Sequence, residues 1–90
     1  MTNNKKDIRL DYEYTLRDAL KTFYDIEFEY KDGRRFTIDF DAEWNRIITN
    51  YERNEVYSRY KDEDDLIDNG KVFGISLIEA INDSKLLGMG

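Results

Sequence analysis

Residues 26–40, IEFEYKDGRRFTIDF, decide the fold of this chain. Apolar and polar residues alternate on both sides of Asp32-Gly33, which is the pattern of a β-hairpin. A two-residue loop at Asp32-Gly33 would set apolar side chains opposite polar ones. A three-residue loop at 31–33, with its glycine in the left-handed conformation, pairs Phe28 with Phe36 instead. Because a slip of one residue moves every side chain to the other face, we expect the three-residue loop.

The segments on either side of this hairpin carry helix signals. Thr15 and Asp18 form a weak capping box, and apolar residues follow at helical spacing, so we expect a helix over 15–24. The acidic run 62–68 predicts a second short helix that ends at Asn69-Gly70. Ser76 and Glu79 form a capping box that begins a third helix.

Residues 44–60 fit two interpretations. Trp44, Ile47, Ile48 and Tyr51 recur at helical spacing, but they also fit a second hairpin that pairs Trp44 with Tyr60 and Ile48 with Val56. In this hairpin the inward-facing apolar residues are even-numbered, as they are in 26–40. Turns at 31–33, 41–43 and 51–53 would also recur about every ten residues, as in a meander. The hairpin is therefore favoured, and the helix remains the alternative.

These elements predict a single α+β domain at 12–90, with an N-terminal helix, a four-stranded antiparallel β-meander and two short C-terminal helices. Residues 1–11 are expected to form a flexible arm with a short ordered piece at 8–10, and residues 86–90 to fray. The odd-numbered sheet face should be exposed to solvent, with Ile47 and Tyr57 as a small apolar spot on it.

Composition excludes several classes of function. The chain of 90 residues has 20 acidic and 14 basic residues, a net charge of -6, and neither cysteine nor histidine. Disulfides, thiolate metal sites and histidine-dependent catalytic triads are therefore excluded. A net negative charge argues against binding to nucleic acid or to an anionic membrane. No segment is apolar enough to span a membrane, and we expect a cytoplasmic protein in a bacterial host cell.

Few residue patterns suggest chemistry. Glu29 and Lys31 have the Glu-x-Lys spacing of metal-dependent nucleases, but Lys31 falls in the expected tight turn. An EF-hand loop over 65–76 would have Ile67 at position three, which needs an oxygen ligand, and Ser76 at position twelve, which needs a bidentate glutamate. The best candidate for binding a single-stranded nucleic acid is a mixed set between two acidic blocks: Arg46, Arg53, Arg59 and Lys61 with Tyr51, Tyr57 and Tyr60. We expect no catalytic residues, no metal site and no cofactor.

Residues 60–81, YKDEDDLIDNGKVFGISLIEAI, resemble the end of many small proteins from Firmicutes and their phages. In that pattern an aromatic residue precedes a short acidic helix, and a Gly-x-Ser-Leu-x-Glu-Ile segment follows. Five positions match, with Ala80 inserted before the last of them: Gly74, Ser76, Leu77, Glu79 and Ile81. The resemblance implies structural roles and no particular activity. By type alone, the chain also resembles the phage-encoded inhibitors of host defence nucleases, the anti-CRISPR and anti-restriction proteins.

These observations predict a non-enzymatic binding protein of a phage or mobile element. Its acidic surface would block a basic, nucleic-acid-binding groove on a host protein such as a CRISPR or restriction nuclease. The predicted partner-binding residues are the acids of two blocks and one aromatic anchor: Glu27, Glu29, Asp39, Asp41, Glu43, Tyr57, Asp62, Glu63, Asp64 and Asp65. The alternative is a structural or self-assembling interaction domain, for example a homodimer formed around Ile47 and Tyr57.

Overall fold

The computed structural model describes residues 6–50 and 55–90, with the backbone alone at 55–57. The helices of this part are α1 (Leu16–Thr22), α2 (Glu63–Asn69) and α3 (Leu77–Asn82). Its strands are β1 (Ile26–Tyr30), β2 (Arg35–Phe40), β3 (Arg46–Asn50), β4 (Glu55–Tyr60), β5 (Lys71–Val72), β6 (Ile75–Ser76) and β7 (Ser84–Met89). The predicted α+β class is confirmed. The predicted number of four strands is wrong, because the described part contains seven strands in two sheets.

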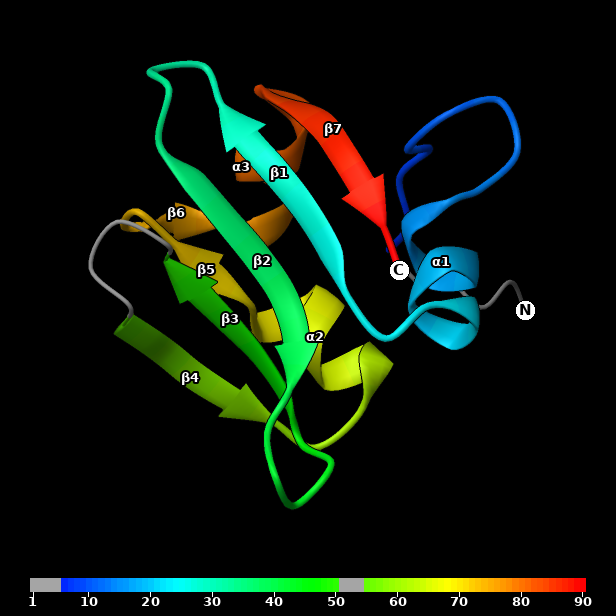
Figure 1. Cartoon of the computed structure of the whole chain (residues 1–90), viewed down its shortest axis with the longest axis vertical. Helices are drawn as coiled ribbons and strands as arrows, with labels where there is room; N and C mark the ends of the chain where they lie inside the picture. The colour runs from blue at the N-terminus through cyan, green and yellow to red at the C-terminus, as the bar shows by residue number, and fades with distance from the viewer. Residues whose placement is uncertain (1–5, 51–54) are drawn as a thin grey trace.

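The main sheet has five strands in the order β4-β3-β2-β1-β7, and β5 pairs with β6 in a small separate hairpin. In Figure 1, α2, α3 and the β5–β6 hairpin lie behind the sheet, and α1 lies beside its lower right corner. No helix of the described chain covers the face of the sheet that is turned toward the viewer in that picture. The sheet is therefore covered by helices on one side only. We call the uncovered side its outer face.

The β1–β2 hairpin has the predicted register. Phe28 pairs with Phe36 and Ile26 with Ile38, and Gly33 has a φ of 92°. All four paired side chains are buried, and the Phe28 and Phe36 rings stack with their centroids 5.1 Å apart. A residue with a side chain is strained at this φ, so glycine is well suited to the third position of the loop.

The predicted helix starts are also confirmed. The hydroxyl of Thr15 accepts a hydrogen bond from the Asp18 N–H, and the hydroxyl of Ser76 accepts one from the Glu79 N–H. Asp62 caps α2 by accepting from the Asp65 N–H, and Gly70 ends that helix. Each cap satisfies a backbone donor that the first helical turn leaves free.

β3 and β4 pair antiparallel, as in the hairpin predicted over 44–60 and not the alternative helix, but the start of β3 differs from the prediction. The loop between β2 and β3 consists of residues 42–44, because the Asp41 N–H bonds to the Asn45 carbonyl across the end of the two strands. Trp44 therefore lies in the loop, has a φ of 65° and is 66% exposed. The prediction that Trp44 faces inward on a strand is wrong.

The predicted register of β3 and β4 is wrong as well. Arg46, not Trp44, lies opposite Tyr60, and Val56 lies opposite Thr49 instead of Ile48. An irregularity between Ile47 and Thr49 shifts the pairing by one residue. The turn expected at 51–53 lies outside the described residues.

The C-terminal residues form a strand instead of fraying. β7 pairs antiparallel with β1, with Leu86 opposite Phe28 and Met89 opposite Ile26. Gly90 then exchanges backbone hydrogen bonds with Asp25. Leu86 and Met89 also pack against the core, so the tail contributes apolar contacts to the sheet as well as hydrogen bonds.

One core lies between the sheet and the helices. The short ordered piece expected at 8–10 is present, since Ile8 and Leu10 pack against this core. No helix of the described part is long and apolar enough to cross a bilayer. The buried apolar side chains form one cluster: Leu16, Ala19, Leu20, Ile26, Phe28, Phe36, Ile38, Ile48, Tyr60, Leu66, Ile67, Val72, Leu77, Ala80 and Ile81.

Candidate binding surface

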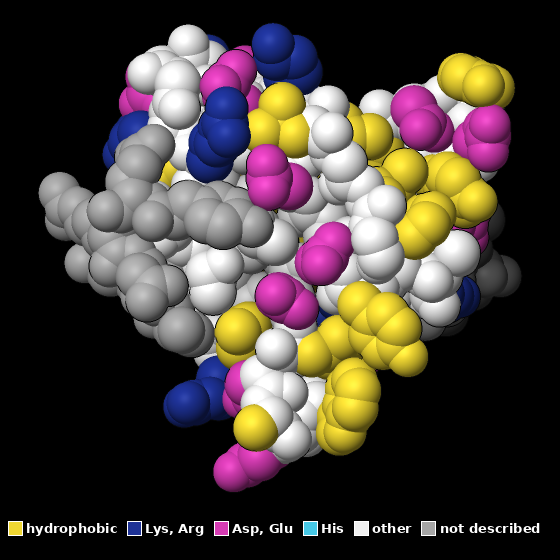
Figure 2. All heavy atoms as spheres, viewed as in Figure 1, with side chains coloured by type: hydrophobic (Ala, Val, Ile, Leu, Met, Phe, Trp, Pro, Cys, Tyr) yellow, Lys and Arg dark blue, Asp and Glu magenta, His cyan; other side chains and the backbone are white. Residues whose placement is uncertain are grey.

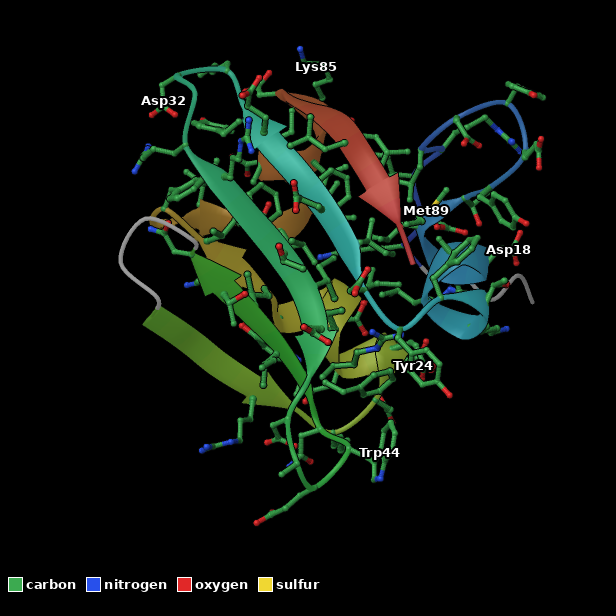
Figure 3. All side chains as sticks on the ribbon, viewed as in Figure 1. Asp18, Tyr24, Asp32, Trp44, Lys85 and Met89 are labelled. Carbon is green, nitrogen blue, oxygen red and sulfur yellow. The ribbon has the colours of Figure 1, made fainter. Side chains whose placement is uncertain are left out.

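An aromatic group lies on the surface at the end of the sheet where β2 meets β3. The Trp44 ring lies 5.4 Å from Phe40 and 6.2 Å from Tyr24, and Tyr24 lies 6.2 Å from Phe40, centroid to centroid. Tyr24 is 65% exposed and Trp44 66% exposed. Figure 3 shows Tyr24 and Trp44 close together at this end of the sheet. We call Tyr24, Phe40 and Trp44 the aromatic platform.

The loop that carries Trp44 is held by the side chain of Asp41. One carboxylate oxygen of Asp41 accepts hydrogen bonds from the N–H groups of Glu43 and Asn45, both at 2.9 Å. The other oxygen accepts from the Asn45 amide at 3.2 Å and from Arg59 Nε at 2.8 Å. Partial burial raises the pKa of Asp41, but these hydrogen bonds outweigh it, and the pKa is lowered. Asp41 therefore positions the indole and is not available to a partner.

Arg46 lies beneath the platform and is only 1% exposed. Its guanidinium donates to the backbone carbonyls of Leu20, Phe23 and Tyr24 at the C-terminal end of α1. It also stacks on the Phe40 ring, with its central carbon 3.8 Å from the ring centroid. Burial lowers the pKa of Arg46, while the nearby carboxylates of Glu63 and Asp39 oppose that effect. Arg46 thus joins α1, β2 and β3 at the point where the platform is built.

A pocket of about 260 Å³ opens next to Tyr24 and Phe40. Glu63 is the acidic residue in its wall and Lys21 the basic one. The lining consists of Leu20, Lys21, Thr22, Phe23, Tyr24, Phe40 and Glu63. The platform therefore borders a recess large enough for one side chain of a partner.

Three of the predicted acids lie on the outer face of the sheet. Glu29 is 3.7 Å from Arg35 and 3.6 Å from Lys85, so its charge is largely compensated. Glu27 and Asp39 have no ion-pair partner among the described residues. Figure 2 shows acidic side chains along the middle of this face, with hydrophobic side chains gathered near its lower end. Acidic and hydrophobic side chains therefore lie on the same face of the molecule in this view.

α2 lies behind the sheet, so the predicted acids at 62–65 do not lie on its outer face. Asp62 caps the helix, Asp64 pairs with Arg17 of α1, and Asp65 accepts from the Lys61 N–H and the Asn69 amide. The Lys61 and Asn69 hydrogen bonds lower the pKa of Asp65. The contacts of these acids lie within the fold, whereas Glu63 faces the pocket beside Tyr24.

The remaining predicted partner-binding residues divide as follows. Glu43 is exposed in the loop next to Trp44. The side chain of Tyr57 lies outside the described residues. Ile47 is only 8% exposed, so the apolar spot expected around it on the outer face is not found at that residue.

Two disfavoured patterns can also be placed. Lys31 pairs with Asp83 at 3.4 Å and Glu29 with basic side chains, and no acidic cluster suited to a metal ion occurs in the described part. Arg46 and Tyr60 of the basic and aromatic set are buried, and Arg59 bonds to Asp41. That set therefore does not form one exposed patch among the residues that are described.

Sequence reasoning missed the platform because Trp44 was placed on a strand. Two signals could have found it. First, Asp41 and Asn45 could enclose a three-residue loop of the kind that Tyr30 and Arg34 enclose. Second, each platform residue has an acidic neighbour in the sequence. An exposed aromatic residue among carboxylates is more typical of a binding surface than of a core.

The comparisons with known proteins add no relative. No protein-family model matches the chain, and comparisons with the curated proteins and with the solved structures gave no match.

Proposed function

We propose that this protein is a non-enzymatic binding protein that occupies a basic surface on a partner protein. The observation that carries the proposal is an exposed aromatic platform on a molecule whose outer sheet face carries Glu27 and Asp39, two partly exposed carboxylates without an ion-pair partner among the described residues. Tyrosine and tryptophan supply much of the binding energy in protein interfaces, and unpaired acids steer a basic partner toward them. The two kinds of group are complementary to an interface of Lys, Arg and apolar residues.

A nucleic-acid-binding groove is the kind of basic surface that such a protein would block. The net charge of -6 favours association with a basic protein over binding to phosphate. The host nucleases named above have such grooves, and inhibition by occupation of the groove requires no catalytic group. The protein would act in the cytoplasm of the bacterial host, because a nuclease of that kind acts there.

The test is a pull-down from bacterial lysate with the tagged protein, washed at low and then at high salt. We expect it to retain a basic nucleic-acid-binding protein, identified by mass spectrometry, that elutes as salt rises. The double variant Glu27→Lys/Asp39→Lys should lose that protein. The matched control, Glu13→Lys/Asp68→Lys, reverses two exposed acids away from the outer face and should retain it.

Two results would contradict the proposal. Equal loss of the retained protein in both double variants would show that only net charge matters. Recovery of the bait alone, unchanged by salt, would favour the self-assembling domain instead.

A further inference from the structure

We infer that the aromatic platform binds an arginine side chain of the partner. The inference rests on the proposed function only for its choice of a basic partner, since the site itself is defined by Tyr24, Phe40 and Trp44. The rings of Tyr24 and Trp44 are tilted by 43° to each other and are each about two-thirds exposed. Such rings offer π-faces over which a guanidinium can lie.

The platform is fixed before a partner arrives. Trp44 is held by the Asp41-centred loop, and Phe40 is held from below by Arg46. The Tyr24 carbonyl bonds to the same arginine at 2.9 Å. The backbone that carries Tyr24 and Trp44 is thus ordered before binding, which reduces the entropy lost on binding.

Charge around the platform favours a cation. Asp25, Asp39 and Glu43 are sequence neighbours of the three aromatic residues, and Glu63 lines the adjacent pocket, whereas Asp41 is already bonded to Arg59. Two basic groups oppose them, because Lys21 borders the pocket and Arg46 covers one face of the Phe40 ring. The Arg46 charge is directed into three carbonyls, however, and Arg59 is bonded to Asp41. The incoming cation would therefore lie over Tyr24 and Trp44 instead of Phe40, beside the loop that also carries the exposed Glu43.

Arginine fits this site better than lysine. Its planar, weakly hydrated guanidinium stacks on aromatic faces and still donates hydrogen bonds to carboxylates at its edge. The fold already contains two such stacks, Arg46 on Phe40 and Arg34 on Phe73, at 3.8 Å and 3.9 Å. A neutral side chain of the same shape would gain the contact but not the charge interaction.

Trp44 is the single tryptophan of the chain, so its fluorescence reports binding at the platform directly. The probe is the blocked tripeptide Gly-Arg-Gly, titrated at low salt, with the lysine peptide and the neutral, isosteric citrulline peptide as comparisons. We expect saturable quenching at millimolar peptide, about fivefold weaker with lysine or citrulline. The variant Tyr24→Ser keeps the reporter and should weaken the arginine titration by a similar factor. Tyr12→Ser, at an 88% exposed tyrosine away from the platform, should leave it unchanged.

Three outcomes would overturn the inference: no saturable signal with the arginine peptide, equal binding of citrulline, or no effect of Tyr24→Ser in a variant with native circular dichroism. Equal binding of citrulline would reassign the platform to neutral side chains. A negative peptide titration and a negative pull-down are independent results, so the failure of the arginine inference can be distinguished from failure of the proposed function. Loss of the partner from Glu27→Lys/Asp39→Lys with no peptide response would support the proposed function without an arginine anchor.

Discussion

The loops at residues 31–33 and 42–44 are built to one plan but end in different residues. In each, the residue before the loop donates its N–H to the carbonyl of the residue after it, at 2.7 Å from Tyr30 to Arg34 and at 3.0 Å from Asp41 to Asn45. The third loop residue of each has a positive φ and bonds back to the residue before the loop. The first loop uses Gly33 for this position and the second uses Trp44.

This difference separates a loop that serves the fold from one that serves a surface. A left-handed conformation costs a residue with a side chain about 1–2 kcal/mol, and glycine avoids that cost. Trp44 accepts it without entering the core, since its side chain is mostly exposed. Strain that persists at an exposed residue is a reason to infer function there.

The largest predicted effect tests what supports the second loop. Arg46→Ala should lower the free energy of unfolding by about 3–5 kcal/mol, because it leaves buried carbonyls without a donor and opens a cavity under Phe40. The measurement is urea denaturation followed by circular dichroism. Arg34→Ala is the matched change at the first loop. There the arginine is exposed, stacks on Phe73, and should contribute less than about 1 kcal/mol.

Similar losses at both arginines would remove the distinction between the two loops. Unchanged stability in Arg46→Ala would show that the three carbonyls find water instead, and that the platform has no buried support.

The sequence predicts the first loop well and the second poorly for a physical reason. A glycine at position 33 predicts a positive φ there, and the alternation of apolar and polar residues around it fixes the register. Trp44 is apolar and even-numbered, so the same alternation assigns it to the core. The position of Trp44 depends instead on Asp41, whose hydrogen bonds to Asn45 and Arg59 arise only when β2, β3 and β4 are assembled.

Arg46 and β7 were missed for related reasons. Arg46 is even-numbered, like the inward-facing residues, but its charge predicts an exposed position. Its burial depends on the carbonyls at the end of α1, which only the folded chain brings to it. The residues of β7 lack strict alternation, and their strand forms only because β1 offers an edge from far away in the sequence. Local pattern therefore predicted the helices and the first hairpin. The platform required contacts between distant segments.

The second prediction concerns the carboxylate in the Trp44 loop. Asp41→Ala should lower Tm by several degrees and change the Trp44 emission, because two loop N–H groups, the Asn45 amide and Arg59 lose their acceptor. Asp32→Ala in the first loop removes bonds to Arg34 alone and should have the smaller effect. Thermal unfolding of both variants against the parent gives the comparison. Equal shifts would contradict a special role for Asp41.

The pH dependence supplies a second readout for Asp41. Its pKa is lower in the folded than in the unfolded chain, so its contribution is complete above the unfolded value of about 3.9 and is lost as pH falls through the folded value. The Trp44 emission should accordingly hold steady at neutral pH and change only in acid, below about pH 4. In Asp41→Asn, whose amide does not titrate, this change should be reduced. An identical acid transition in that variant would assign the effect to other carboxylates.

The smallest predicted effect isolates the backbone difference between the two loops. Gly33→Ala should lower the free energy of unfolding by about 1 kcal/mol, because open space surrounds the added methyl group and only the positive φ opposes it. At the second loop, Trp44→Gly should be more stable than Trp44→Ala by about the same 1 kcal/mol, since both variants lack the indole and only alanine retains the strain. Urea denaturation of the three variants and the parent gives both differences. Equal stability of the alanine and glycine variants at position 44 would mean that the loop leaves the left-handed conformation once the ring is gone. In that case the aromatic contacts of Trp44 would fix the conformation of the loop, and the loop would not fix the position of the ring.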